Sequence, residues 1–174
     1  MKHAHESLSF WGMNLRVGVL SDSHVNDLAS LPKKAANLLE GMDMIMHTGD
    51  YTSKRLVDEL RKLGNFEGVH GNMDSFDVKA ELPADRILEL KGFRIGVTHP
   101  SEGGSPFGLE KRIRAKFENV EAIVYGHTHR PKNEVISGVL FFNPGSITGR
   151  FPAKHKTFGV LKIGKKIEGE IIRL

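Results

Sequence analysis

The chain has 174 residues, and its 39% hydrophobic and 26% charged residues are ordinary for one globular domain with a buried core. No stretch approaches the roughly 18 apolar residues of a membrane span, and the net charge of +4 is scattered, so we expect neither membrane nor nucleic-acid binding. The absence of cysteine excludes disulfides, zinc–thiolate sites and cysteine nucleophiles.

The N-terminal stretch M-K-H-A-H-E-S-L-S-F-W-G-M has no long apolar run and no small-residue cleavage site, so we expect no secretory signal and a cytoplasmic protein. Met13 precedes the first strand-like run and is a second candidate for the start. We therefore expect residues 1–13 to be a disordered extension and residues 14–174 to form a single domain.

The first half of the chain alternates between short apolar runs and amphipathic segments. The runs favour strands over 15–20, 42–46 and 66–70. Apolar spacing favours helices from Pro32 to Gly41 and over 54–63, with Asp27 and Ser53 as N-caps. This β-α-β-α-β order predicts parallel strands covered by helices.

The second half has a different pattern, and we expect it to be mostly antiparallel. A Gly/Ser/Pro-rich loop over 100–108 separates its first hairpin from the next helix. The expected elements are a hairpin of 87–90 and 93–98, a helix over 109–117, a strand over 122–125, a hairpin within 135–142, and a last hairpin of 158–163 and 167–172.

Polar residues collect at the ends of the expected strands. Seven of them fall within a few residues of a strand end: Asp22, His24, Asp50, Asn72, His99, His127 and His129. In open α/β sheets the loops at the carboxyl ends of strands meet in one crevice, so these side chains can converge. The Asp-x-His and His-x-His spacings each place two side chains on the same side of an extended backbone.

The chemistry of this set favours a metal site. Each residue alone has a structural explanation as a cap, a turn residue or a buried histidine, but the joint pattern over separate strand ends does not. Carboxylate, imidazole and amide ligands without sulfur suit Mn, Fe, Co, Ni or Zn. Seven ligands exceed one tetrahedral site and fit two ions at roughly 3.5–4 Å, bridged by one carboxylate.

The motifs, read in order, resemble those of the calcineurin-like metallophosphoesterases, and most closely the small single-domain bacterial and archaeal phosphodiesterases. They are D-S-H at 22–24, G-D at 49–50, G-N-x-D at 71–74, T-H at 98–99, G-H-T-H at 126–129 and N-P-G-S at 143–146. The resemblance implies an α/β fold, a four-layer α/β/β/α sandwich, with a binuclear metal centre at the carboxyl ends of its strands.

The resemblance also implies roles. One ion would be held by Asp22, His24 and His129, the other by Asn72, His99 and His127, with Asp50 bridging both. Manganese is the first expectation, and nickel, iron, cobalt and zinc are alternatives. The implied reaction is hydrolysis of a small-molecule phosphate ester or diester by in-line attack of a hydroxide bridging the two ions, with Asp50, Asn72 and His99 as catalytic residues.

Met73 departs from the family pattern, because many relatives carry there a histidine that protonates the leaving group, although several small members lack it. We therefore predict a preference for diesters with acidic leaving groups. His70, beside this position, is expected to point away along its strand. Pro100 follows His99, and the loop after it is either a rim over the substrate or a plain surface connection.

Two other functions stay open. One subunit of the retromer complex has this fold and serves mainly as a scaffold, and the loss of histidine at Met73 permits that interpretation. A phosphomonoesterase is the other, with Arg130 or Lys132 binding a terminal phosphate. His47 is expected to be structural, and Asn143 and Ser146 to support the site from behind. The sequence leaves a homo-oligomer open.

Overall fold

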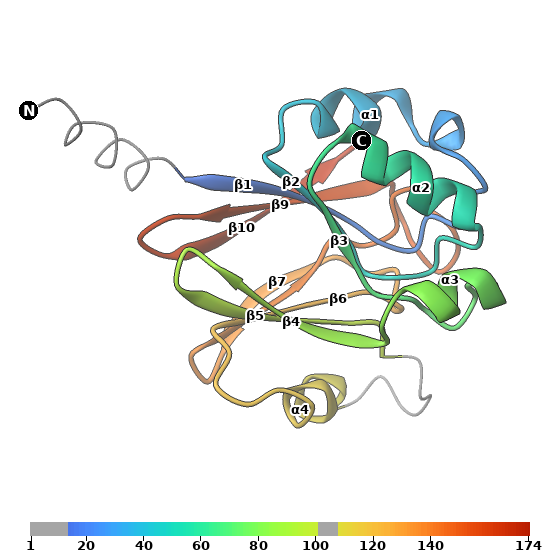
Figure 1. Cartoon of the computed structure of the whole chain (residues 1–174). Helices are drawn as coiled ribbons and strands as arrows, with labels where there is room; N and C mark the ends of the chain where they lie inside the picture. Colours follow the sequence, from blue (N-terminus) through green and yellow to red (C-terminus); the bar gives the residue numbers. More distant parts are fainter. Residues whose placement is uncertain (1–13, 101–107) are drawn as a thin grey trace, which may run out of the picture.

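The computed structural model describes residues 14–100 and 108–174, which form two five-stranded sheets (Figure 1). The first sheet, in the order β10-β9-β1-β2-β3, consists of β1 (Leu15–Leu20), β2 (Met44–His47), β3 (Phe66–Gly68), β9 (Thr157–Ile163) and β10 (Ile167–Arg173). The strands β1, β2 and β3 are parallel, which confirms the expectation for the first half of the chain. The final hairpin joins this sheet because β9 pairs antiparallel with β1.

The second sheet has the order β4-β5-β6-β8-β7 and consists of β4 (Asp85–Leu90), β5 (Phe93–Thr98), β6 (Ala122–Tyr125), β7 (Lys132–Ile136) and β8 (Val139–Asn143). The hairpins expected here are confirmed as β4–β5 and β7–β8. However, β5, β6 and β8 are parallel neighbours, and the sequence pattern did not predict this. A helical crossover joins β5 to β6, and the chain passes through β7 at the sheet edge before β8 returns beside β6.

The helix expected over 54–63 is confirmed, whereas those expected from Pro32 to Gly41 and over 109–117 are shorter in the structure. The helices are η1 (Leu28–Ser30, a 3-10 turn), α1 (Lys33–Leu39), α2 (Lys54–Leu63), α3 (Phe76–Glu81) and α4 (Leu109–Arg114). The cap expected at Ser53 is confirmed, because its side chain accepts the N–H of Arg55 at the start of α2. Asp27 caps the 3-10 turn η1, where its side chain accepts the N–H of Ser30, whereas α1 begins after Pro32 without a side-chain cap. Helix α3 was not expected from the sequence.

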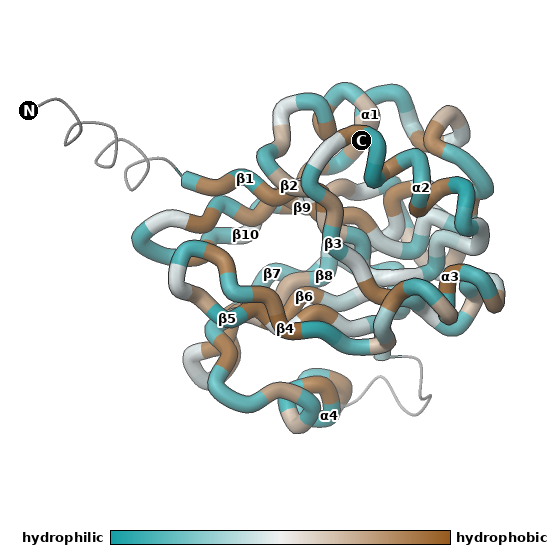
Figure 2. Tube along the Cα trace, viewed as in Figure 1, coloured by the Kyte–Doolittle hydropathy of each residue, from teal (hydrophilic) through white to brown (hydrophobic). Residues whose placement is uncertain are grey.

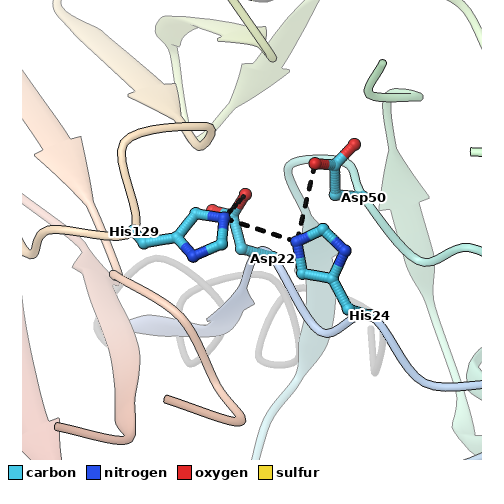
Figure 3. Close-up of side chains that lie close together, drawn as sticks. All are labelled: Asp22, His24, Asp50 and His129. Atoms are coloured by element: carbon cyan, nitrogen blue, oxygen red, sulfur yellow. Dashed lines mark hydrogen bonds and ion pairs between the residues drawn. The ribbon is translucent and has the colours of Figure 1, made fainter. Parts of the chain in front are cut away.

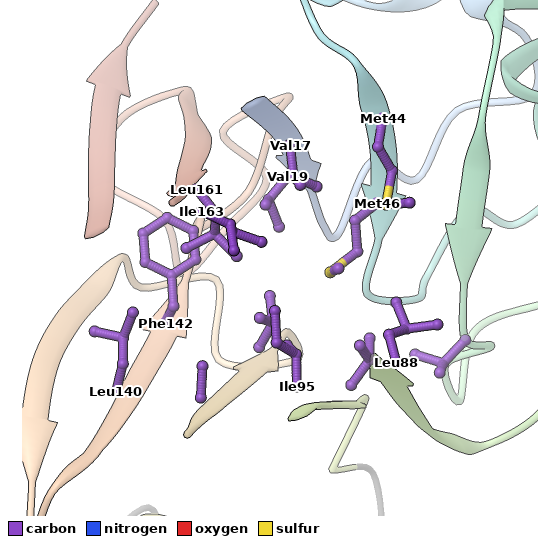
Figure 4. Close-up of a cluster of buried hydrophobic side chains, with 14 residues drawn as sticks. Val17, Val19, Met44, Met46, Leu88, Ile95, Leu140, Phe142, Leu161 and Ile163 are labelled. Carbon is purple, nitrogen blue, oxygen red and sulfur yellow. The ribbon is translucent and has the colours of Figure 1, made fainter. Parts of the chain in front are cut away.

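Alternate residues of each central strand point into two different cores. Val17 and Val19 face the space between the sheets, where they join a cluster that includes Ile95 and Phe142 (Figure 4). Leu20 faces the other way, toward a cluster formed with α1, α2 and α3. The second sheet packs its outer face against α4 in a third cluster. The order of layers is therefore α/β/β/α, as expected.

Hydropathy follows this layering, with hydrophobic stretches in strands of both sheets and hydrophilic segments in the outer turns (Figure 2). No helix in residues 14–100 and 108–174 has the length and apolar character that a membrane crossing requires. The expected N-terminal extension and nearly all of the loop after Pro100 lie outside the described residues. Five strands, β1, β2, β3, β5 and β6, lead directly into the loops that carry the candidate ligands.

Candidate metal centre

The structure brings all seven sequence-predicted ligands into one cluster at the carboxyl ends of strands from both sheets. Asp22, His24, Asp50 and His129 each offer an atom within 4.8 Å of the others (Figure 3). His99 and His127 contact this group directly, and Asn72 joins it through His127. His99 Nε2 lies 3.4 Å from Asp50 Oδ2, and His127 Nδ1 lies 3.2 Å from Asn72 Oδ1. The ring centroids of His99 and His127 are 5.2 Å apart.

The backbone at the candidate ligands is unusual. Nine non-glycine residues in the described part of the chain have positive φ, and five of them belong to the cluster: Asp22 at 50°, His24 at 48°, Asp50 at 60°, His127 at 74° and His129 at 57°. Asp and His adopt this left-handed conformation more readily than most residues, but it still costs conformational energy. Such a concentration of it at one place is typical of a functional site.

Hydrogen bonds to carbonyl groups fix the tautomers of two histidines. His99 Nδ1 donates to the Thr48 carbonyl at 2.7 Å, so in the neutral ring Nε2 carries a lone pair. That Nε2 is buried and has no hydrogen-bond partner. Likewise, His129 Nδ1 donates to the Arg150 carbonyl at 2.9 Å, which leaves its Nε2 lone pair facing Asp22 Oδ1 at 3.2 Å. Both lone pairs therefore face carboxylate oxygens.

Two lone pairs that face each other repel unless a cation or a proton lies between them. His24 adds a third nitrogen, because its Nε2 lies 3.3 Å from His129 Nε2 and 3.6 Å from Asp50 Oδ2. The converging donor atoms are nitrogen and oxygen without sulfur, which suits a borderline divalent ion. The residues of this cluster therefore fit a metal, and the orphaned, buried Nε2 of His99 is the clearest sign of it.

The electrostatics of the cluster favour positive charge inside it. Burial alone lowers the pKa of His99, but the carboxylates of Asp50 and Asp22 outweigh burial and raise it. Burial also acts to lower the pKa of His129. The hydrogen bond with Asp22 outweighs this effect, so the pKa of His129 is raised. For Asp50, burial acts to raise the pKa, yet the neighbouring His99 holds it at about 2. Asp50 is therefore ionised at neutral pH.

Asp74 ties the G-N-M-D turn to the loop that carries Asp50. Its carboxylate accepts the N–H groups of Gly71 at 2.7 Å, Thr52 at 2.7 Å and Asp50 at 3.1 Å. The turn also contacts the Asp50 side chain itself, because the Met73 N–H donates to Asp50 Oδ1 at 2.8 Å. A side chain at Gly71 would collide with Asp50, so only glycine allows this close approach. The Met73 side chain is 53% exposed.

Asn143 and Ser146 support the loops that carry Asp22, His127 and His129, as the sequence suggested. Asn143 Nδ2 donates to the Gly126 carbonyl and to Thr128 Oγ1, each at 3.1 Å, and so fixes the loop between His127 and His129. Ser146 Oγ donates to the Asp22 carbonyl at 2.8 Å. Both polar side chains are completely buried.

His47 is structural, as expected. The Gly49 N–H donates to its Nδ1 at 3.2 Å, so its Nε2 carries the proton and donates to Ser23 Oγ at 2.9 Å. Burial lowers the pKa of His47 to about 3, so the ring is neutral. The His70 ring is turned to the backbone, with Nδ1 lying 3.3 Å from the Gly71 carbonyl.

Arg150 belongs to the surroundings of the cluster, and sequence reasoning missed it. Its carbonyl accepts from His129, and its N–H donates to Ser146 Oγ at 3.1 Å. Burial is the main cause of the lowered pKa of His24, and the Arg150 guanidinium lowers it further, so this charge acts on the cluster. The available signal was the position of Arg150 soon after N-P-G-S. Lys132, by contrast, is engaged by acidic side chains.

The comparisons with known proteins agree with this geometry. The calcineurin-like phosphoesterase superfamily domain matches residues 15–166. A probable metallophosphoesterase of Methanocaldococcus jannaschii is 35% identical over 172 residues, covering 97% of this chain and 86% of that protein. A second protein of that organism, named a phosphodiesterase, is 28% identical over 172 residues, covering 91% of this chain and 99% of its own.

The fold also recurs in a solved structure of lower sequence identity. A crystal structure of Vps29 from Entamoeba histolytica, complexed with Zn²⁺, superposes with a TM-score of 0.64 at 22% identity, covering 91% of this chain and 98% of that one. At this identity the likeness shows the fold alone.

Proposed function

The chain belongs to the calcineurin-like phosphoesterase superfamily, and on that premise we propose that it is a metal-dependent phosphodiesterase with a binuclear centre. The observation that carries the proposal is the convergence of imidazole nitrogens on carboxylate oxygens, with His99 Nε2 3.4 Å from Asp50 Oδ2 and His129 Nε2 3.2 Å from Asp22 Oδ1. The name of the 28% identical relative supports a diester substrate.

Seven residues would hold the ions in this proposal. Asp22, His24 and His129 would bind one ion, Asn72, His99 and His127 would bind the other, and Asp50 would contact both. Two divalent ions, when bound, supply a water of lowered pKa and neutralise the charge of phosphate oxygens. Manganese remains the first expectation, with nickel, iron, cobalt and zinc as alternatives.

The protein's own contribution is to fix the ligands before substrate arrives. The carbonyls of Thr48 and Arg150 orient two imidazoles so that each presents Nε2 to the centre. The Met73 N–H occupies Asp50 Oδ1 and leaves Oδ2 facing His99 and His24. The Arg150 guanidinium adds a positive charge that an anionic phosphate ester would meet at the edge of the centre.

Met73 determines which substrates would react well. A thioether has no acidic proton, so a departing alkoxide would receive no proton from this position. An aryl leaving group departs as a weakly basic anion and does not need that proton. We therefore propose a preference for diesters with acidic leaving groups.

The proposal is tested by a panel of phosphomonoesters, phosphodiesters and cyclic nucleotides, each assayed with Mn²⁺, Ni²⁺, Co²⁺ and Zn²⁺. We expect hydrolysis of a nitrophenyl diester above all with Mn²⁺. Asp50→Asn should lower kcat at least about 10²-fold, because the ions lose their shared charge. Full activity of Asp50→Asn would show that Asp50 does not bridge, and a clear preference for monoesters would overturn the diesterase assignment.

A scaffold remains the second candidate, on the observation that Phe76 and Phe151 are 83% and 89% exposed. Large exposed apolar side chains are available for contact with a partner protein. Purified protein that contains no metal, hydrolyses no ester in the panel and copurifies with one partner would favour the scaffold. Bound divalent metal together with turnover would exclude it as the main function.

A further inference from the structure

A pocket of about 410 Å³ lies beside the candidate metal centre and shares His129 with it. One wall follows β6 and includes Arg130 and Pro131, and the other wall leads into β9 and includes Pro152 and Lys154. Because His129 belongs to both, the pocket lies directly beside the candidate metal centre.

The ionisable side chains among the described lining residues of this pocket are all basic. Arg130, Lys154 and His155 line the pocket, and no Asp or Glu is among the described lining residues. Arg130 and Lys154 form no ion pair within residues 14–100 and 108–174, whereas Lys132 nearby is paired with Glu110 at 2.6 Å. The pocket therefore presents positive charge that the residues described by the structure do not neutralise.

Thr157 provides a second, independent sign of a ligand. This residue is only 4% exposed and lines the pocket, and its Oγ1 is buried with no hydrogen-bond partner. A buried hydroxyl without a partner costs free energy, so its presence is best explained by a group that it can bind. Glycine at position 145 leaves room for this hydroxyl, because a side chain there would collide with Oγ1.

We propose that this pocket is a subsite for a second anionic group of the substrate. The substrate class is a phosphodiester whose retained ester group ends in a phosphate or phosphonate. Arg130 and Lys154 would bind the terminal anion, Thr157 would donate a hydrogen bond to it, and the two prolines would contact the connecting carbon chain. The location of the reacting diester rests on the proposed function, whereas anion binding in the pocket does not.

Two substrates with one leaving group test the subsite. These are p-nitrophenyl ethyl phosphate and p-nitrophenyl 2-phosphonoethyl phosphate, assayed with the metal-loaded protein. We expect the phosphonate to lower KM about tenfold, because charge-assisted hydrogen bonds replace contacts with water. The double variant Arg130→Ala/Lys154→Ala should remove most of that advantage while changing KM for the ethyl ester far less. Lys165→Ala, in the exposed β9–β10 turn, is the matched control and should retain the full advantage.

Thr157→Val gives a test in which binding and stability move in opposite directions. Loss of the hydroxyl should raise KM for the phosphonate substrate about fivefold. The same substitution removes a buried unsatisfied group and should raise the midpoint of thermal unfolding. Thr157→Ser keeps the hydroxyl and should restore the KM. A purely structural role for Thr157 would instead lower stability and affect both substrates equally.

Binding to protein treated with EDTA separates this inference from the proposed function. Calorimetric titration with 2-hydroxyethylphosphonate should show binding that the double variant loses and Lys165→Ala keeps. If neither diester is hydrolysed but this binding occurs, the diesterase assignment fails and the subsite stands. If the diesters are hydrolysed, the phosphonate gives no KM advantage and the EDTA-treated protein binds no phosphonate, the subsite is overturned.

Discussion

The two halves of the candidate centre are built differently. The half formed by Asp22, His24 and His129 has left-handed backbone at every residue, and two of its three residues are buried. In the other half, His99 is buried, but Asn72 is exposed and its side chain contacts only His127 in the described part of the chain. One half is therefore rigidly held, and the other ends in an exposed amide on a turn.

The dependence between the halves runs in one direction. Both Asp22 carboxylate oxygens accept the N–H of His127, at 3.2 and 3.1 Å, so the first half positions a candidate ligand of the second. Asn72 gives nothing comparable in return, since its carbonyl accepts from Lys79 on the surface. We infer that damage to the first half should dismantle both halves, whereas loss of Asn72 should affect only its own.

The largest effect is expected from a comparison of Asp22→Ala with Asn72→Ala. Asp22→Ala should lose both ions, because a ligand and the hydrogen-bond acceptor for His127 disappear together. Asn72→Ala should keep one ion per chain, because the buried half stays intact. The measurement is metal content by mass spectrometry after dialysis against Mn²⁺, with activity measured in parallel.

His70→Ala is the matched control for this comparison, since the His70 ring contacts the Gly71 carbonyl and no candidate ligand in the described residues. It should retain two ions. The asymmetry would be refuted if Asn72→Ala lost both ions or if Asp22→Ala retained one.

A smaller effect is expected from the groups that anchor each half. Asp74→Ala leaves three N–H groups without their acceptor and should lower the free energy of unfolding of the metal-free protein by about 3 kcal/mol. Asn143→Ala removes the support of the loop around Thr128 and should cost about 1–2 kcal/mol. Urea unfolding checks both values.

Asp77→Ala, an exposed acidic residue on α3, serves as the control and should change stability by less than about 0.5 kcal/mol. If Asp74→Ala resembled this control, the three hydrogen bonds would not be what holds the G-N-M-D turn against Asp50.

Local patterns predicted the parts of the molecule that local forces determine. Residues close together in sequence determine the cap at Ser53, the helix over Lys54–Leu63 and the strand-end position of the candidate ligands. Helix α3 escaped prediction because its six residues bury only Val78, which leaves no apolar period to detect. The parallel pairing of β5, β6 and β8 depends on distant partners, and hairpin signals in the same region pointed elsewhere.

In the candidate site, too, features set by local sequence were predicted and features set by distant contacts were not. The candidate ligands were visible as residue types at strand ends, and their convergence is confirmed. Arg150 and Thr157 were not recognised from the sequence. Arg150 matters through its carbonyl, which accepts from His129, and through its charge, and Thr157 through its unpartnered hydroxyl. Nothing in the sequence around Thr157 indicates that its hydroxyl is buried without a partner.

The smallest effect on activity is expected from Met73→His in the G-N-M-D turn. The Met73 side chain is 53% exposed and only its N–H binds Asp50, so an imidazole fits without repacking and metal content should not change. We expect the rate on an alkyl diester, relative to a nitrophenyl diester, to rise about tenfold. This lies below the 10²–10⁴-fold typical of a positioned acid, because nothing orients the new ring.

The pH dependence of that gain identifies its cause. An exposed imidazole has a pKa near about 6.5 and donates a proton only when charged, so the gain should be largest below that pH and fade above it. Met73→Gln places a polar side chain of similar length without an acidic proton, and its rate ratio should equal that of the wild type. An unchanged ratio in Met73→His would mean that proton transfer to the leaving group does not limit this half of the centre.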